Sequence, residues 1–103
     1  MSSEKRRSLH LAAVFACNFT NHIYTLSYKL LENESIPADV LLPLIDETVS
    51  KIHSMPPAAA QTGPAIRYDE NVINKHLAML DDPDMQAIYR LLSQSIHKDA
   101  QNE

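Results

Sequence analysis

Glycine is almost absent from this 103-residue chain, which contains only Gly63. A dinucleotide-binding Gly-X-Gly-X-X-Gly turn needs several glycines, because the backbone must turn tightly and approach the phosphates closely. A single glycine excludes such a turn from this chain. We therefore expect any nucleotide chemistry to come from another domain or another chain.

Cysteine is limited to Cys17, so the chain cannot form an internal disulfide. Its apolar neighbours make this thiol a weak nucleophile and fit a reduced, cytoplasmic protein. The sequence also lacks the Cys-X-X-Cys and His-X-X-X-His spacings of zinc sites. We expect no metal site.

Positive charge is scarce: the longest basic run is Lys5-Arg6-Arg7, and the formal net charge is −4. This balance argues against nucleic acid as the main partner. No apolar run reaches the length of a membrane span, and Asn18 interrupts the stretch that a signal peptide would need. We expect a cytoplasmic protein that binds neither nucleic acid nor membrane.

Apolar residues at helical spacing account for most of the remaining sequence and predict one all-α domain over residues 1–103. Ser2 or Ser3, Asp69 and Asp82 are suitable N-caps. Pro43 lies too deep for the helix that follows Pro37, so we expect a kink or a late helix start there. The prediction is a bundle of about four to five helices, with the main ones over about 3–32, 38–52, 70–80 and 83–97, a short turn near 58–61, and a frayed tail from residue 98.

The stretch Leu9–Tyr28 is apolar over most of a helical wheel, so we expect it at the centre of the bundle. His10 and Asn18 lie on the opposite side, about 80° and roughly 12 Å apart if the helix is regular. They either line one groove and bind two ends of a ligand, or are ordinary interior polar groups. A helix of about 45 Å is long for so small a domain, and we expect a homodimer at micromolar concentration.

The connection at 56–69 holds three prolines and the only glycine, and long ordered loops are often functional. Arg67, just ahead of a helix N-terminus, is suited to hold a carboxylate or phosphate. Alternatively, it pairs with Asp69. Among the histidines, we expect His76 to be a core residue bonded to a backbone carbonyl, and His53 and His97 to be helix-dipole partners.

Four segments follow a familiar order: HLAAVFACNF at 10–19, TGPAIRYD at 62–69, HL at 76–77 and YRLL at 89–92. Together they resemble the C-terminal helical domain of a Rossmann-like NADP-dependent oxidoreductase family of undefined substrate. Its relatives include deazaflavin-dependent NADP oxidoreductases, pyrroline-5-carboxylate reductases and the 6-phosphogluconate dehydrogenase group. The resemblance covers nearly the whole chain and implies a fold like the 6-phosphogluconate dehydrogenase C-terminal domain.

The resemblance also implies an N-terminal dinucleotide-binding Rossmann domain of the same protein, which would bind NADP. This helical domain would dimerise and close over the nicotinamide end of the cofactor. His10, Asn18, Thr62 and Arg67 match motif positions and become candidates for binding substrate, whereas no residue of this chain would bind the cofactor.

Two departures from the family pattern limit what the resemblance implies. Arg67-Tyr68-Asp69 stands where the family usually has Arg-Gly-Asp, so Tyr68 would narrow a pocket or stack on a ligand. Val14 stands one helical turn before Asn18, where hydroxyacid dehydrogenases have lysine, which argues against their mechanism.

Two functions remain for this chain. The first is the dimerisation and substrate-side domain of an NADP-dependent oxidoreductase, inactive without its Rossmann domain. The second is a stand-alone helical module whose apolar groove binds a partner helix.

Overall fold

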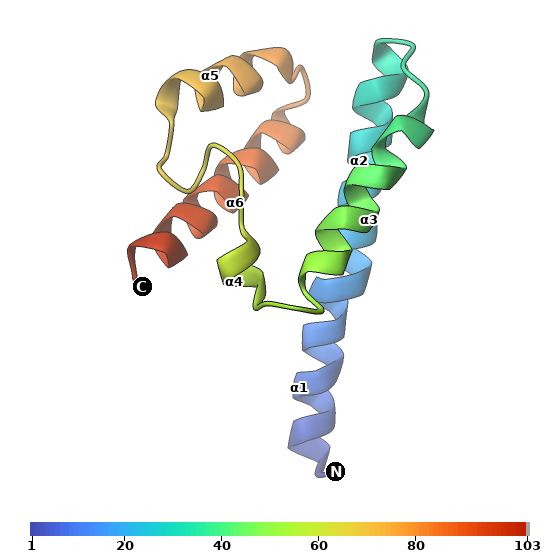
Figure 1. Ribbon diagram of the computed structural model, residues 1–103, viewed down its shortest axis with the longest axis vertical. Coiled ribbons are helices and arrows are strands. Elements are labelled where there is room, and N and C mark those ends of the chain that lie inside the picture. Colours follow the sequence, from blue (N-terminus) through green and yellow to red (C-terminus); the bar gives the residue numbers. More distant parts are fainter. Residues whose placement is uncertain (103) are drawn as a thin grey trace. The chain divides into compact units, whose positions relative to one another are not determined.

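The computed structural model describes residues 1–102, and every regular element within that range is helical (Figure 1). The predicted all-α fold class is therefore confirmed. The elements are α1 (Ser3–Ala13), the π-helix η1 (Val14–Phe19), α2 (Thr20–Asn33), the 3₁₀-helix η2 (Ala38–Leu41), α3 (Leu42–Lys51), α4 (Pro57–Ala60), α5 (Glu70–Met79) and α6 (Pro83–Gln101). The chain forms two compact units, Met1–Pro43 and Leu44–Glu103, each of which is described by itself.

The first unit consists mainly of the continuous helical stretch α1–η1–α2, which begins and ends near the predicted residues. The Ser2 side chain caps it by accepting a hydrogen bond from the Lys5 amide at 3.1 Å. At the other end Ser35 has a left-handed φ of 56°, and the Ile36 amide reaches back to the Leu31 carbonyl at 3.0 Å. This pairing satisfies a carbonyl that the helix end would leave free.

The late helix start predicted at Pro43 is confirmed. A 3₁₀ turn, η2, follows Pro37, and the α-helix α3 begins only at Leu42. Pro43 is thus the second residue of α3, a position at which a helix has no use for the missing backbone N–H.

In the second unit, both predicted aspartate caps are present. Asp69 accepts a hydrogen bond from the Val72 amide at the start of α5, and Asp82 accepts one from Asp84 at the start of α6. The Gln86 side-chain amide then donates to the carbonyl of Leu80 at 2.7 Å, which fastens the first turn of α6 to the end of α5. The predicted fraying from residue 98 is wrong, because α6 continues to Gln101.

The buried residues lie in the second unit: Ile73, Leu80, Ala65 and Ser93, with Ile73 only 2% exposed. The elements α1, η1 and α2 contain no buried residue. The prediction of a central helix over Leu9–Tyr28 is therefore wrong. Leu11, Phe15 and other large apolar side chains of this stretch are exposed, with Phe15 at 62%, and its remaining large apolar side chains are only half-buried.

Within residues 1–102, no helix combines the length and apolar character needed to cross a membrane.

Candidate functional site

His10 and Asn18 lie in the first unit, on either side of a change in helical winding. His10 belongs to α1, and Asn18 belongs to the π-helix η1; both are exposed. A π-helix pairs residues five apart instead of four, so it has more residues per turn. The angle of about 80° expected for a regular helix does not apply across this segment.

Asn18 shares the π-helix with two exposed aromatic residues. Phe15 and Phe19 pack edge to face, with ring centroids 5.1 Å apart. The Thr20 hydroxyl donates to the Phe15 carbonyl at 3.2 Å, which supplies that carbonyl with a side-chain partner. Short π-segments inside α-helices occur often at functional sites, and here the segment coincides with half of the candidate pair.

Thr62 and Arg67 lie together in the second unit. Both line an open hollow of about 400 Å³, formed by the connection that leads into α5. Backbone hydrogen bonds define the turn, notably from the Asp69 amide to the Pro64 carbonyl at 2.9 Å. Gly63, with a φ of 103°, supplies the left-handed conformation that the turn requires.

The charged side chains that line this hollow are Arg67 and Asp69. Asp69 caps α5 with its carboxylate, and Glu70 adds a second negative charge in the first turn. The Asp69 carboxylate takes up the Val72 amide at the helix N-terminus, and both negative charges reduce the positive potential there. The expectation that free helix amides would assist Arg67 is therefore not supported, and its guanidinium is the only cationic side chain lining the hollow.

Tyr68, the departure from the family motif, has a left-handed backbone with a φ of 50°. Glycine adopts that conformation without strain, whereas a side chain makes it costly. The Tyr68 ring packs against the His97 imidazole on α6, with centroids 5.4 Å apart. His97 in turn hydrogen-bonds through Nδ1 to the Ile66 carbonyl at 3.0 Å, so the two rings fasten the turn to α6.

His76 is not the core histidine that its apolar neighbours predicted. It is exposed, and its Nδ1 hydrogen-bonds to the Tyr89 hydroxyl at 2.8 Å. Burial, and to a lesser degree the nearby Tyr68, raises the pKa of Tyr89 above that of an ordinary tyrosine. Sequence reasoning missed this pair because the two residues lie on different helices, 13 positions apart.

The four candidate residues thus divide between the two units: His10 and Asn18 in the first, Thr62 and Arg67 in the second. Cys17 is exposed and unbridged. No group of three metal-binding side chains occurs in the described part of the chain.

Comparison with known proteins identifies the relatives of this chain. Residues 1–96 match the family model described as "Domain of unknown function (DUF2520)". No curated protein shows significant similarity. The crystal structure of a "putative NADP oxidoreductase" from Bacteroides fragilis is 65% identical, with a TM-score of 0.93 over 95% of this chain. This chain spans 38% of the length of that protein.

The family match covers most of the chain, and the structural match preserves both the sequence and the helical fold. The resemblance to the helical domain of an NADP oxidoreductase family, first indicated by the motifs at 10–19 and 62–69, is confirmed. The chain belongs to the DUF2520 family.

Proposed function

We propose that this chain is the C-terminal dimerisation and substrate-side domain of an NADP-dependent oxidoreductase. The main support is the 65% identity to the Bacteroides fragilis protein, of which this chain spans only 38%. A chain with one glycine lacks a dinucleotide-binding turn. In this proposal, a Rossmann domain of the same protein binds NADP, and the helical domain is inactive without it.

Within this proposal, His10, Asn18, Thr62 and Arg67 contact the substrate. Their exposure supports this role, because each side chain is open to a ligand or to a second domain. Arg67 would bind an anionic group, and Thr62 lines the same hollow. His10 and Asn18 lie in the first unit, on either side of the start of the π-helix.

We further propose that the first helical stretch forms a homodimer. It is uncharged from Ser8 to Tyr28 if histidine is neutral. It also exposes large apolar side chains, with Leu11 at 60% and Phe15 at 62%. Apolar surface of this kind on a helix is typical of a protein interface.

Measurements of cofactor binding test whether the Rossmann domain, and not the helical domain, binds NADP. The 103-residue chain should not quench or shift NADPH fluorescence, whereas the protein that includes the proposed Rossmann domain should bind NADPH. The coding sequence that precedes residue 1 should encode a strand followed by Gly-X-Gly-X-X-Gly. A stop codon there, or NADPH binding by the helical chain alone, would contradict the proposal.

The substrate-side residues are tested in the same longer protein, by NADPH oxidation with a panel of carbonyl and imine compounds. Arg67→Ala should raise KM for anionic substrates by about tenfold or more, the effect of losing one charged hydrogen bond. Arg67→Lys should raise KM by less than Arg67→Ala does. Because His10 contacts the substrate in this proposal, His10→Ala should lower the rate of NADPH oxidation. His22→Ala, on the same helical stretch, is the control and should leave that rate unchanged.

The exposed apolar face of the first unit also favours a second candidate, a stand-alone module that binds a partner helix. This alternative requires no Rossmann domain, so the coding sequence upstream separates the two. A natural start at residue 1, together with a 1:1 complex with a helical partner, would favour the module.

A further inference from the structure

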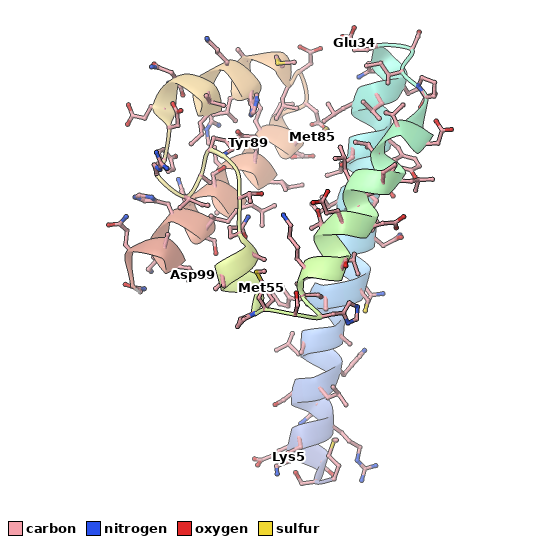
Figure 2. The ribbon with its side chains drawn as sticks, in the orientation of Figure 1. Lys5, Glu34, Met55, Met85, Tyr89 and Asp99 are labelled. Atoms are coloured by element: carbon pink, nitrogen blue, oxygen red, sulfur yellow. The ribbon has the colours of Figure 1, made fainter. Side chains whose placement is uncertain are left out.

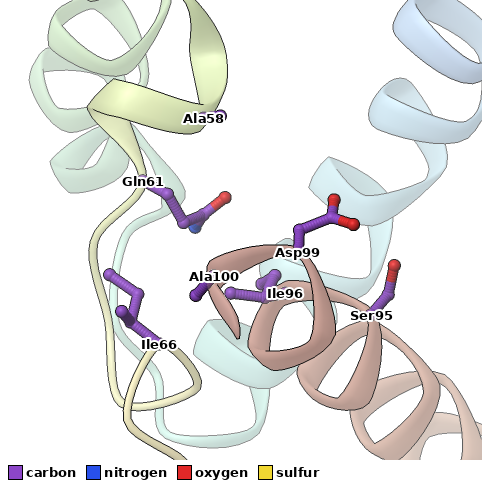
Figure 3. Close-up of a pocket in the computed structure, with 7 residues that line it drawn as sticks. All are labelled: Ala58, Gln61, Ile66, Ser95, Ile96, Asp99 and Ala100. Carbon is purple, nitrogen blue, oxygen red and sulfur yellow. The ribbon is translucent and has the colours of Figure 1, made fainter. Parts of the chain in front are cut away.

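A second, more enclosed cavity of about 210 Å³ lies within the second unit (Figure 3). Its wall comes from α4, from the connection that follows and from the last turns of α6. The seven lining residues are Ala58, Gln61, Ile66, Ser95, Ile96, Asp99 and Ala100. None of the candidate substrate residues lines this cavity, although Gln61 and Ile66 line both it and the hollow around Thr62 and Arg67.

The polar side chains of the cavity are Gln61, Ser95 and Asp99, each of which can accept a hydrogen bond. Asp99 is the only ionisable side chain among the seven lining residues. Gln61 donates its amide N–H to the Thr62 carbonyl at 3.0 Å, which leaves its amide oxygen as the free end. In Figure 3 that oxygen points across the cavity toward the side that carries Asp99 and Ser95.

The position of Asp99 on α6 strengthens this negative potential. It lies near the C-terminal end of a 19-residue helix, where the helix dipole is negative. An aspartate there is unfavourable for the helix itself, because cations, and not anions, stabilise helix C-termini. Asp99 therefore adds negative charge at this end of the cavity, next to Lys98 in the last turn of the same helix.

The remaining lining side chains are aliphatic: Ala58, Ile66, Ile96 and Ala100. They suit a short hydrocarbon body next to the charged group. A cavity of about 150 Å³ holds a six-atom ring such as benzene, so about 210 Å³ takes a ligand of about six to eight non-hydrogen atoms.

We propose that this cavity binds a small primary ammonium ion with an unbranched aliphatic body of about five carbons. The ammonium group donates to the Asp99 carboxylate, the Gln61 amide oxygen and the Ser95 hydroxyl. The carbon chain packs against Ile66 and Ile96. This inference does not depend on the proposed oxidoreductase function.

Titration of the 103-residue chain with n-pentylammonium, followed by backbone amide chemical shifts, tests the proposal. A ligand of this size should bind with a Kd of about 1–10 mM. The largest shifts should fall on the amides of residues 58–66 and 95–100. The neutral 1-pentanol and the anionic pentanoate have the same carbon body and should bind about two- to fivefold more weakly, because they lack the cation that pairs with the exposed Asp99.

Two variants distinguish the site from general attraction to an acidic protein. Asp99→Asn should weaken pentylammonium binding by about two- to fivefold. It should not lower the midpoint of thermal unfolding, because it removes an unfavourable charge from the helix end. Ala100→Leu keeps the carboxylate but fills the cavity, and should weaken binding of pentylammonium and pentanol alike. Asp46→Asn, the same charge change on α3, is the control and should leave Kd unchanged.

The proposal is overturned if pentylammonium and pentanol bind equally, if the shifts lie outside the two lining segments, or if Asp46→Asn weakens binding as much as Asp99→Asn. If either lining variant loses its helical circular dichroism, the other variant and the ligand series decide the matter.

Discussion

Tyr68 has a left-handed backbone conformation that is sterically unfavourable for a residue with a side chain. Its φ of 50° is one that glycine adopts readily, and its ring packs against His97. Tyr68 also contributes to the raised pKa of Tyr89, which is labelled in Figure 2. Strain of this kind persists only where the surroundings stabilise it. The neighbouring Arg67 and Thr62 line the hollow assigned to substrate, so the strained residue lies at the proposed functional turn.

The strain at Tyr68 should reverse the usual order of alanine and glycine. Both Tyr68→Ala and Tyr68→Gly lose the ring contact, but only glycine also relieves the left-handed backbone, so the glycine variant should be more stable by about 1 kcal/mol. Urea unfolding measures the difference. Tyr28, which lies in α2, is the matched control: there the alanine variant should be the more stable by about 1 kcal/mol.

The raised pKa of Tyr89 predicts a loss of stability at alkaline pH. Because the folded chain holds this proton more tightly than the unfolded chain, the stabilisation is complete below the ordinary tyrosine pKa of about 10 and is lost as pH rises through the folded value. At pH 7, Tyr89→Phe should cost about 1 kcal/mol, from the lost hydrogen bond to His76.

The difference in free energy of unfolding between the native protein and Tyr89→Phe should shrink between pH 9 and pH 12, as measured by urea unfolding at each pH. Tyr28→Phe provides the control and should follow the native protein throughout. A deficit that stays constant over this range would contradict the assignment of Tyr89.

At the scale of elements, the helix boundaries follow from short-range signals. Ser2, Asp69 and Asp82 are capping residues in the sequence and cap helices in the structure. The late start of α3 follows from Pro43 and the missing backbone N–H. The π-helix at Val14–Phe19 has no such signal, because alanine and phenylalanine are compatible with either winding.

The stability that the helix cap contributes can be measured with variants of two adjacent aspartates, Asp81 and Asp82. Asp82→Ala should destabilise the protein by about 1 kcal/mol, because the Asp84 amide loses its 2.9 Å partner at the start of α6. Asp82→Asn should keep most of the stability. Asp81→Ala changes an exposed residue outside the cap, and its effect should stay within about 0.5 kcal/mol. Equal losses for the two alanine variants would show that the cap contributes nothing.

At the scale of the whole molecule, the exposed apolar side chains of the first unit support the proposed homodimer. The chain buries its core in the second unit and leaves the elements α1, η1 and α2 without a buried residue. The proposed homodimer would cover the apolar side chains around Phe15 and Phe19, whose edge-to-face rings form a compact anchor.

A charge placed on that anchor should dissociate the dimer. Phe15→Glu should weaken self-association by about 30-fold or more, since large central side chains at interfaces contribute about 2 kcal/mol or more. Sedimentation equilibrium from 1 to 100 µM measures this (concentrations of about this order bracket a micromolar dimer). Met79→Glu, at a 75% exposed position of α5, is the control. A native protein that is monomeric over the whole range would remove the proposal.

The sequence alone determined the all-α class, the capped helix starts at residues 3, 70 and 83, and the family, because caps, prolines and apolar spacing act over a few residues. Only the tertiary structure decided which apolar face is buried and which histidine has which partner. Leu9–Tyr28 has the composition of a core helix yet contains no buried residue. A hydrogen bond to a backbone carbonyl was expected for His76, but it is His97 that makes one. Burial and pairing depend on segments distant in the sequence, which helical periodicity does not contain.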